Sequence, residues 1–198
     1  MDIKVDHVNK AYGEQQVLRD LSCVFPEGKT TCIRGRSGSG KTTLIQLLLR
    51  LDVPDKGKIE GISDRKISAV FQEDRLCENL SAASNIRLVC TKTISDRELE
   101  EAYKAVALTE VWQKPVRELS GGMRRRVSIL RALLADSDCV IMDEPLRGLD
   151  EKTRAKTIDY ILKKTERKTL IFVTHEEQEA VWLKADKTLK FMKDHLIK

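Results

Sequence analysis

The chain has 198 residues, of which 41% are hydrophobic and 5% aromatic, so it fits one domain with a mainly aliphatic core. The 36 basic and 31 acidic residues give a net charge of +5, which indicates a mixed, solvated surface rather than a strongly basic nucleic-acid binder. The sequence has no signal-peptide core, no apolar run near the roughly 20 residues that span a bilayer, and no disulfide or zinc spacing among its five cysteines, which fits a reducing cytosol.

Alternating apolar residues over 3–25 predict short antiparallel strands, with turns at 12–14 and 26–29. Tyr12 stands beside the first turn. Its ring could be a plate for an adenine base, but the residues alone favour an ordinary turn or rim tyrosine.

A glycine loop follows the β-branched run 30–33 and precedes the leucine-rich run 44–49, so the order is strand, loop, helix. The helix should end before Pro54. The glycines and the start of the helix leave backbone N–H groups free to bind phosphate. Lys41 supplies a positive charge for the β- and γ-phosphates, and the Thr42 hydroxyl is placed to bind Mg²⁺. A glycine-rich structural turn is the alternative. The loop comprises Gly35, Arg36, Ser37, Gly38, Ser39, Gly40, Lys41, Thr42 and Thr43.

A hairpin or short strand is expected at 57–61 and a buried strand at 67–71, which Gln72 follows. Ligands gather at the carboxyl ends of strands in open α/β sheets, so Gln72 could reach Mg²⁺ or an attacking water. A lone glutamine in a loop could also serve only as a hydrogen-bonding group. Residues 76–119 then change character, and helices are expected at 79–86 and 96–106 as a small helical insertion.

Ser120, Gly121 and Gly122 open a strong helix and form a second anion cradle by the same physics as the first. The arginines at 124–126 could clamp a phosphate or lie on a solvated helix face. We favour the solvated face, because the apolar residues from 127 to 134 carry the packing.

An apolar strand at 139–142 ends in Asp143 and Glu144. Burying such a pair is unfavourable unless it acts on a cation, so Asp143 is interpreted as a Mg²⁺ ligand and Glu144 as the general base for water. A strand-end turn is the alternative. His175 follows the strand 170–174, which we expect beside the strand of Glu144, and it is interpreted as a γ-phosphate sensor. A helix at about 176–184 and a strand at 188–192 close the chain.

These motifs together resemble the ATP-binding subunits of ABC transporters over almost the whole chain. The resemblance identifies the Walker A loop (35–43), the Q-loop (Gln72), the LSGG signature (119–122), Walker B (139–143), the D-loop (148–150) and the H-loop (His175). It implies a P-loop NTPase core with a mostly parallel sheet, an N-terminal antiparallel section and a helical subdomain at about 76–119, between core segments 1–75 and 120–198 of a single domain.

The resemblance also implies how the chain works. Two copies would close head to tail around two ATP molecules, with Lys41, Thr42, Gln72 and Asp143 holding Mg²⁺ and ATP on one subunit. Ser120, Gly121 and Gly122 of the other copy would cover the γ-phosphate. Glu144 would activate water, His175 would contact the γ-phosphate, Asp150 would couple the two sites, and Tyr12 would stack on adenine.

The expected partners are an integral membrane permease and, for an importer, an extracytoplasmic substrate-binding protein. The expected location is the cytoplasmic face of the membrane, and no nucleic acid is expected. The segment 70–86 resembles importers of the nitrate, sulfonate and taurine group, which favours import. The alternatives are a compact exporter ATPase, a soluble ABC-type ATPase acting on ribosomes or DNA, and a module that binds ATP without useful hydrolysis.

Three features depart from the family pattern. Met123 replaces the usual glutamine after the signature, Arg147 precedes Gly148 where a small residue is common, and the chain stops at Lys198 without further C-terminal helices. None removes a residue assigned to the chemistry.

Overall fold

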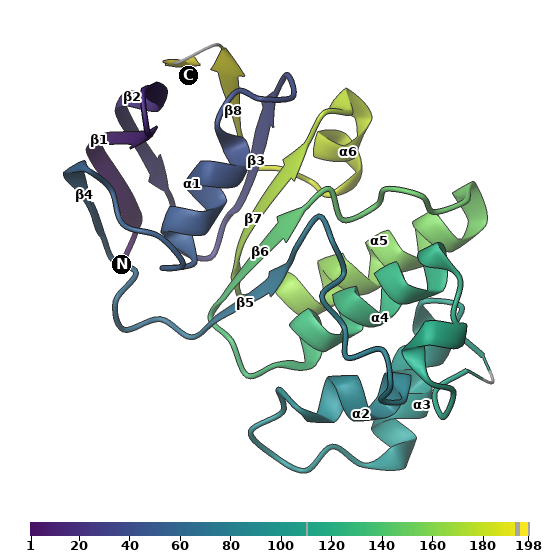
Figure 1. The fold of residues 1–198 in the computed structure, drawn as a ribbon. Helices are drawn as coiled ribbons and strands as arrows, with labels where there is room; N and C mark the ends of the chain where they lie inside the picture. The colour runs from purple at the N-terminus through teal and green to yellow at the C-terminus, as the bar shows by residue number, and fades with distance from the viewer. Residues whose placement is uncertain (110, 193–194, 198) are drawn as a thin grey trace.

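Two β-sheets enclose the first helix in the computed structural model, which describes the backbone of residues 1–109, 111–192 and 195–197 (Figure 1). The larger sheet has the strand order β5-β6-β7-β3-β8-β9 and is parallel except for its last pair. The smaller sheet has the order β2-β1-β4 and is antiparallel. The predicted α/β architecture, with a mostly parallel sheet and an N-terminal antiparallel section, is confirmed.

The strands are β1 (Ile3–Tyr12), β2 (Gln15–Phe25), β3 (Thr30–Gly35), β4 (Lys56–Glu60), β5 (Ile67–Val70), β6 (Cys139–Asp143), β7 (Thr169–Thr174), β8 (Lys187–Met192) and β9 (His195–Ile197). The helices are α1 (Lys41–Leu48), α2 (Ala82–Arg87), α3 (Asp96–Ala105), the 3₁₀ turn η1 (Val116–Glu118), α4 (Gly121–Leu134), α5 (Glu151–Thr165) and α6 (Glu177–Trp182). No helix within the described ranges has the length and apolar character that crossing a bilayer requires.

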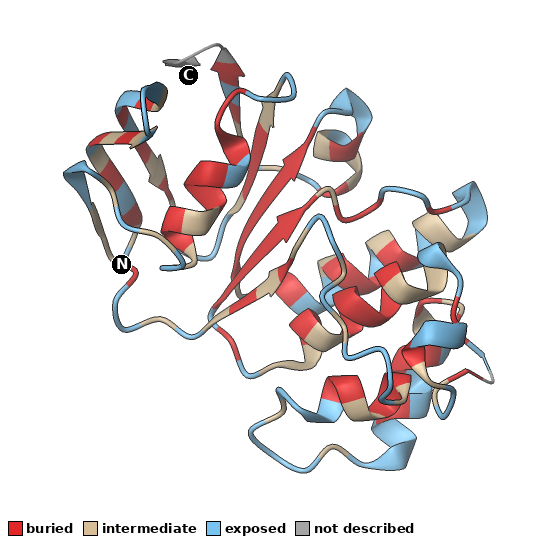
Figure 2. Cartoon of the chain, in the orientation of Figure 1, coloured by how far each residue is buried: buried red, intermediate tan, exposed pale blue. Residues whose placement is uncertain are grey.

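The central strands are buried on both faces, as their nearly continuous apolar sequences predict (Figure 2). Along β6, Cys139 and Ile141 pack towards α1 and the small sheet, whereas Val140 and Met142 pack towards α4 and α5. This alternation follows from the period of two in a strand. The sheet therefore separates two apolar cores.

The segment 76–119 contributes α2, α3 and η1, which pack beside α4 and α5 (Figure 1). The apolar residues spaced along one face of the second helix and its C-cap, Leu99, Ala102, Tyr103 and Val106, are all buried. The first helix begins later than expected, because Ser81 caps α2 by accepting the N–H of Ser84 at 3.0 Å, so the expected helical start at 79 is wrong.

The prediction that the arginines at 124–126 lie on a solvated face is wrong. Arg125 and Arg126 are only 4% and 6% exposed. Each guanidinium is satisfied by backbone carbonyls of segments distant in sequence, among them Phe71 and Glu144 for Arg125 and Val106 and Ala107 for Arg126. Buried charges need such partners, and the sequence of the helix alone does not reveal them.

Candidate active site

The carboxyl ends of β5, β6, β7 and β3 lie side by side at one edge of the large sheet. Register pairs Val70 with Met142, and Asp143 with Val173, across these neighbouring strands. The loops that follow the strands carry the glycine loop, Gln72, Glu144 and His175. The expectation that the strand before His175 neighbours the strand before Glu144 is therefore confirmed.

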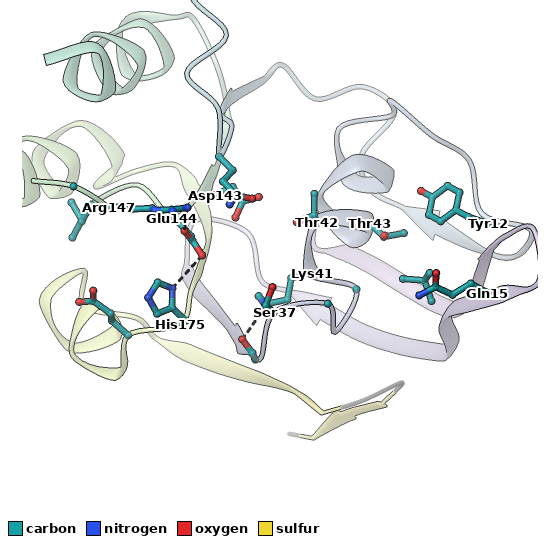
Figure 3. Close-up of a pocket in the computed structure, with 18 of the residues that line it drawn as sticks. Tyr12, Gln15, Ser37, Lys41, Thr42, Thr43, Asp143, Glu144, Arg147 and His175 are labelled. Carbon is teal, nitrogen blue, oxygen red and sulfur yellow. Dashed lines mark hydrogen bonds and ion pairs between the residues drawn. The ribbon is translucent and has the colours of Figure 1, made fainter. Parts of the chain in front are cut away.

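These loops surround a cleft of about 850 Å³ (Figure 3). Its lining includes most of the residues predicted from the sequence, and these come from both sheets and from segments far apart in the chain. The predicted residues in the lining are Tyr12, Gly35, Ser37, Gly38, Gly40, Lys41, Thr42, Thr43, Gln72, Asp143, Glu144 and His175. The predicted residues outside the lining are Arg36, Ser39, Ser120, Gly121, Gly122 and Asp150.

The glycine loop has the backbone that its sequence requires. Gly38 and Gly40 have φ of 77° and 94°, which favours glycine, and Gly40 immediately precedes α1. A Cβ at Gly35 would stand 2.6 Å from the carbonyl oxygen of Phe191 on β8, so only glycine fits there. The loop thus brings unpaired N–H groups and a helix N-terminus to one wall of the cleft.

Lys41 is 9% exposed and donates from Nζ to the carbonyl oxygens of Gly35, at 2.9 Å, and Arg36, at 2.7 Å. Burial lowers the pKa of the Lys41 ammonium, while Asp143 and Glu144 act in the opposite direction. Ser39 is buried and lies outside the cleft lining, and its hydroxyl oxygen has no hydrogen-bond partner among the described residues.

Asp143 ends β6 and is 5% exposed. Burial raises the pKa of its carboxyl group, the neighbouring Glu144 raises it further, and Arg125 and Lys41 lower it. A buried carboxylate beside an exposed Thr42 hydroxyl and the Gln72 amide, all on one cleft, is an oxygen donor set suited to a hard divalent cation. The residues present therefore fit Mg²⁺.

Glu144 is held from three sides. Its backbone has φ of 47°, an uncommon conformation for a residue with a Cβ, and its N–H donates to Val173 O at 2.9 Å. One carboxylate oxygen lies 3.1 Å from Nδ1 of His175, and the other accepts from Arg147 at 3.2 Å (Figure 3). The carboxylate is thus oriented at the cleft wall, where a base acting on water is needed.

Tyr12 is 46% exposed at the cleft rim, and its hydroxyl donates to Asp52 Oδ2 at 2.7 Å. Lys10 bonds the other Asp52 oxygen at 2.8 Å and lies 5.3 Å from the centre of the Tyr12 ring. Hydrogen bonds from Lys10 and Tyr12 hold the pKa of Asp52 at about 2. The hydroxyl group thus anchors the ring at its polar end.

The second predicted anion cradle lies at the start of α4. Ser120 is the N-cap of this helix and accepts the N–H of Met123 at 3.4 Å, while Gly121 is exposed. Asp150 is likewise a helix cap, because it accepts from the N–H of Thr153 at 3.0 Å at the start of α5. Neither contributes to the cleft of its own chain.

Several lining residues were not predicted from the sequence as part of the site. Gln15 and Val17 come from β2, and Leu146, Arg154 and Glu176 come from the loops and helix beyond β6 and β7. No motif marks these positions. Arg147 also lines the cleft, and its place three residues after Glu144 in the sequence is a signal for the ion pair between them.

Residues 18–147 match the family profile described as ABC transporter. The chain is 33% identical over 195 residues to the sulfate/thiosulfate import ATP-binding protein CysA of Synechococcus elongatus, covering 90% of this chain and 57% of the relative. It is 33% identical over 189 residues to the aliphatic sulfonates import ATP-binding protein SsuB 1 of Paracoccus denitrificans, covering 94% and 78%. It is 35% identical over 198 residues to the spermidine/putrescine import ATP-binding protein PotA of Fusobacterium nucleatum, covering 91% and 52%. The chain thus spans between about half and four-fifths of the length of these relatives.

Solved structures share the fold over the whole chain. The dimeric post-hydrolysis state of the ATP-binding cassette MJ0796, bound to ADP and Pi, has a TM-score of 0.86 at 27% identity, covering 99% of this chain and 97% of that one. A bacterial Atm1-family ABC exporter with ATP bound has a TM-score of 0.88 at 23% identity, covering 100% of this chain and 38% of the exporter chain. At that identity the exporter match shows the fold alone.

Proposed function

The chain belongs to the ABC transporter family, and from that membership we propose that it is an ATPase subunit that drives transport through a separate membrane permease. The observation that carries the proposal is the cleft itself. It brings the glycine loop with Lys41, the carboxylates of Asp143 and Glu144, and His175 to one carboxyl edge of the sheet. This is the set that hydrolysis of a nucleoside triphosphate requires.

The substrate, ATP, would bind with its phosphates against the glycine loop. Backbone N–H groups and Lys41 would hold the phosphate oxygens in place of the Gly35 and Arg36 carbonyls that Lys41 bonds now. Arg36 and Ser37 of the loop belong to the proposed phosphate site, and Tyr12 would stack on adenine. The ADP and Pi bound to the MJ0796 cassette support a nucleotide here.

Thr42, Gln72 and Asp143 would hold Mg²⁺ when the nucleotide is bound. When bound, the cation supplies Lewis-acid stabilisation of charge on the phosphate oxygens. Asp143 would then be matched by a countercharge, which favours its ionised form over the neutral form that burial favours.

Glu144 is the proposed general base for the attacking water. Its carboxylate is an acceptor already oriented by His175 and Arg147, and its backbone is fixed by Val173. His175 would contact the γ-phosphate from its place at the end of β7. Gln72 is exposed on the cleft wall, where it could assist in placing the water or the cation.

The second cradle supports a site completed by another copy. Ser120, Gly121 and Gly122 lie away from the cleft of their own chain, and the exposed Gly121 has open space where a Cβ would stand. We propose that this cradle covers the γ-phosphate of the other subunit in a head-to-tail homodimer, and that Asp150 lies at that interface. The dimeric MJ0796 cassette supports the arrangement.

Import is the proposed direction. The relatives named above carry the names of import ATP-binding proteins for sulfate, sulfonates and polyamines, and segment 70–86 led to the same expectation from the sequence. The proposed partners are therefore an integral membrane permease and an extracytoplasmic substrate-binding protein. The proposed location is the cytoplasmic face of the membrane, with 76–119 as a helical subdomain facing the permease.

The test compares wild type with Glu144→Gln. A general base contributes about 10²–10⁴-fold, so steady-state ATP hydrolysis should fall by at least about 100-fold while ATP binding persists. The same variant, loaded with Mg-ATP and used to capture partners from detergent-solubilised native membranes, should retain an integral membrane permease. Hydrolysis at the wild-type rate would overturn the assignment of the base, and capture of ribosomes or DNA instead of a permease would overturn the transport function.

A further inference from the structure

Arg125, in the second turn of α4, joins the two loops that carry the proposed chemistry. From Nη1 it donates to the carbonyl oxygens of Phe71, at 2.5 Å, and Gln72, at 3.4 Å. From Nη2 it donates to the carbonyl oxygens of Asp143 and Glu144, the latter at 2.5 Å. Nε completes the set with the carbonyl oxygen of Pro145 at 3.3 Å. One side chain thus contacts the backbone on both sides of a gap between two loops.

That gap opens where the sheet ends. The parallel pairing of β5 with β6 runs from Ile67 and Cys139 to Val70 and Met142 and stops there. Beyond this point no strand hydrogen bonds connect the two segments in the β5–β6 pairing. The guanidinium of Arg125 connects them instead, because it donates to backbone carbonyls of both segments. The planar fork of an arginine suits this task, whereas the single ammonium of a lysine cannot contact so many acceptors in fixed directions.

The Arg125 contacts also support the strained backbone at Glu144. Glu144 has φ of 47°, and such a conformation persists only where the surroundings determine it. Its N–H is held by Val173 O on β7 at 2.9 Å, and its carbonyl is held by Arg125. The direction of the Glu144 side chain therefore depends on α4 as well as on the sheet.

Charges around Arg125 make this buried position tenable. Asp74, 23% exposed at its side chain, lies 3.3 Å from Nη1 and supplies the opposite charge. A buried cation without such partners would be strongly unfavourable. Arg131, two turns along the same helix, donates to the carbonyls of Asp74 and Arg75 and so adds a second attachment for the loop after β5.

We infer that Arg125 is a positioning residue for hydrolysis: it sets the placement of Gln72 relative to Glu144 and ties both to the helix that begins with the second anion cradle. A shift of α4 against a partner subunit would then move the loops of Gln72 and Glu144 together. This inference rests on the proposed ATPase function. It concerns a side chain that does not line the cleft and that acts through the backbone of Gln72, Asp143 and Glu144, which do.

The experiment uses Arg125→Lys, with Arg65→Lys as the control. Both arginines have mostly buried side chains and bind backbone carbonyls, but those of Arg65 belong to Gly61 and Met1, outside the cleft lining. For each full-length variant one measures the unfolding midpoint, the Kd for ADP by calorimetry, and kcat and KM for ATP. Both variants should lower the unfolding midpoint by a few degrees.

Only Arg125→Lys should change the chemistry. Misplacement of a catalytic group by about 1 Å lowers rates by about 100-fold, so we expect kcat to fall roughly 10- to 100-fold in this variant. Its Kd for ADP should stay within threefold of wild type, because Lys41 and the glycine loop are unchanged. Arg65→Lys should keep kcat within about threefold. Asp74→Asn, which keeps the arginine and removes only its anionic partner, should give a smaller fall in kcat at unchanged Kd.

Equal losses of kcat in the two lysine variants, or a kcat in Arg125→Lys equal to wild type, would overturn the inference and leave Arg125 a structural residue. If Arg125→Lys does not fold, Asp74→Asn decides: an unchanged kcat in that variant overturns the inference. These outcomes are distinct from failure of the proposed function, which would show as absence of hydrolysis in wild type or as full activity in Glu144→Gln.

Discussion

The substitution Gly121→Ala should stabilise the folded chain but impair ATP hydrolysis, if a second copy of the chain completes the active site. Gly121 is the first residue of α4, and a Cβ built there meets nothing within 4 Å. Alanine is favoured over glycine in helices by up to about 1 kcal/mol. At the first helical position we expect about 0.5 kcal/mol of added stability, which corresponds to a rise in the unfolding midpoint of roughly 1–2 °C for a domain of this length.

The same methyl group should harm hydrolysis. In the proposed dimer, the cradle of Ser120, Gly121 and Gly122 closes on the γ-phosphate bound to the partner subunit. The added Cβ would stand where that phosphate must approach, so the backbone N–H groups of the cradle could not reach the phosphate. Loss of one such donor lowers kcat by about 10²–10³-fold, so a fall of at least about tenfold is expected for a donor held too far away. Binding of ADP to a single chain should be unchanged, because Gly121 is outside the cleft lining.

The assays are thermal unfolding, calorimetric titration with ADP, and steady-state hydrolysis at saturating ATP. Asp96→Ala is the control, since Asp96 is also the first residue of an exposed helix start, that of α3, and lies outside the cleft lining. It should alter stability by a similar amount with unchanged kcat. If Gly121→Ala is more stable but hydrolyses ATP at the wild-type rate, the proposal that this cradle completes the site of another subunit is refuted. If the variant is less stable than wild type, the inference that the helix start has room for a Cβ is refuted.

Three further predictions each concern one residue. Gly35→Ala should lower the free energy of unfolding in urea by about 1–3 kcal/mol, since its Cβ would stand 2.6 Å from the Phe191 carbonyl; a change below 0.5 kcal/mol would contradict this. Arg147→Ser removes a 3.2 Å ion pair in which the arginine is 62% exposed, so it should change stability by under about 1 kcal/mol. Because Arg147 helps to orient Glu144, kcat should fall by up to about fivefold; an unchanged or raised kcat would show that Arg147 does not orient the base. Burial raises the pKa of Glu179, so the folded chain keeps that proton to a higher pH than the unfolded chain. Its contribution to stability should fall as pH rises from about 4.5 through the folded pKa, and Glu179→Gln should flatten this slope in denaturation curves measured across that range.

The strands and the edge of the candidate site could be predicted because their causes are local. A β-branched run such as 30–33 forms a strand, and the residues directly after parallel strands meet at one edge. Gln72, Glu144 and His175 are therefore brought together as expected from their positions in the sequence. Local pattern also predicted a helix at 96–106; the structure has α3 at Asp96–Ala105, and its Ser95–Glu98 capping box lies within one turn of its start.

The arginines of α4 could not be placed in this way, because their partners are backbone carbonyls. Every residue has a carbonyl, so the sequence carries no mark of which ones point towards a helix 50 residues away. The anchor of Tyr12 is similar, since Asp52 lies 40 residues along the chain in a loop without a motif. Charged side chains in a helix are usually solvated, and only the tertiary arrangement reveals the exceptions.

Lys41 and Asp143, two buried ionisable side chains of the cleft, show why the site is suited to a ligand that carries both negative and positive charge. Burial lowers the pKa of Lys41 and raises that of Asp143, so in each case the protein disfavours the charged form. A polyphosphate supplies negative charge to the lysine, and a divalent cation supplies positive charge to the carboxylate. Each component alone leaves one of the two charges without its counterpart. The cleft therefore favours the metal-nucleotide pair over either component, and Arg125, which contacts the backbone of Asp143 from behind, keeps that carboxylate at the place where the pair must bind.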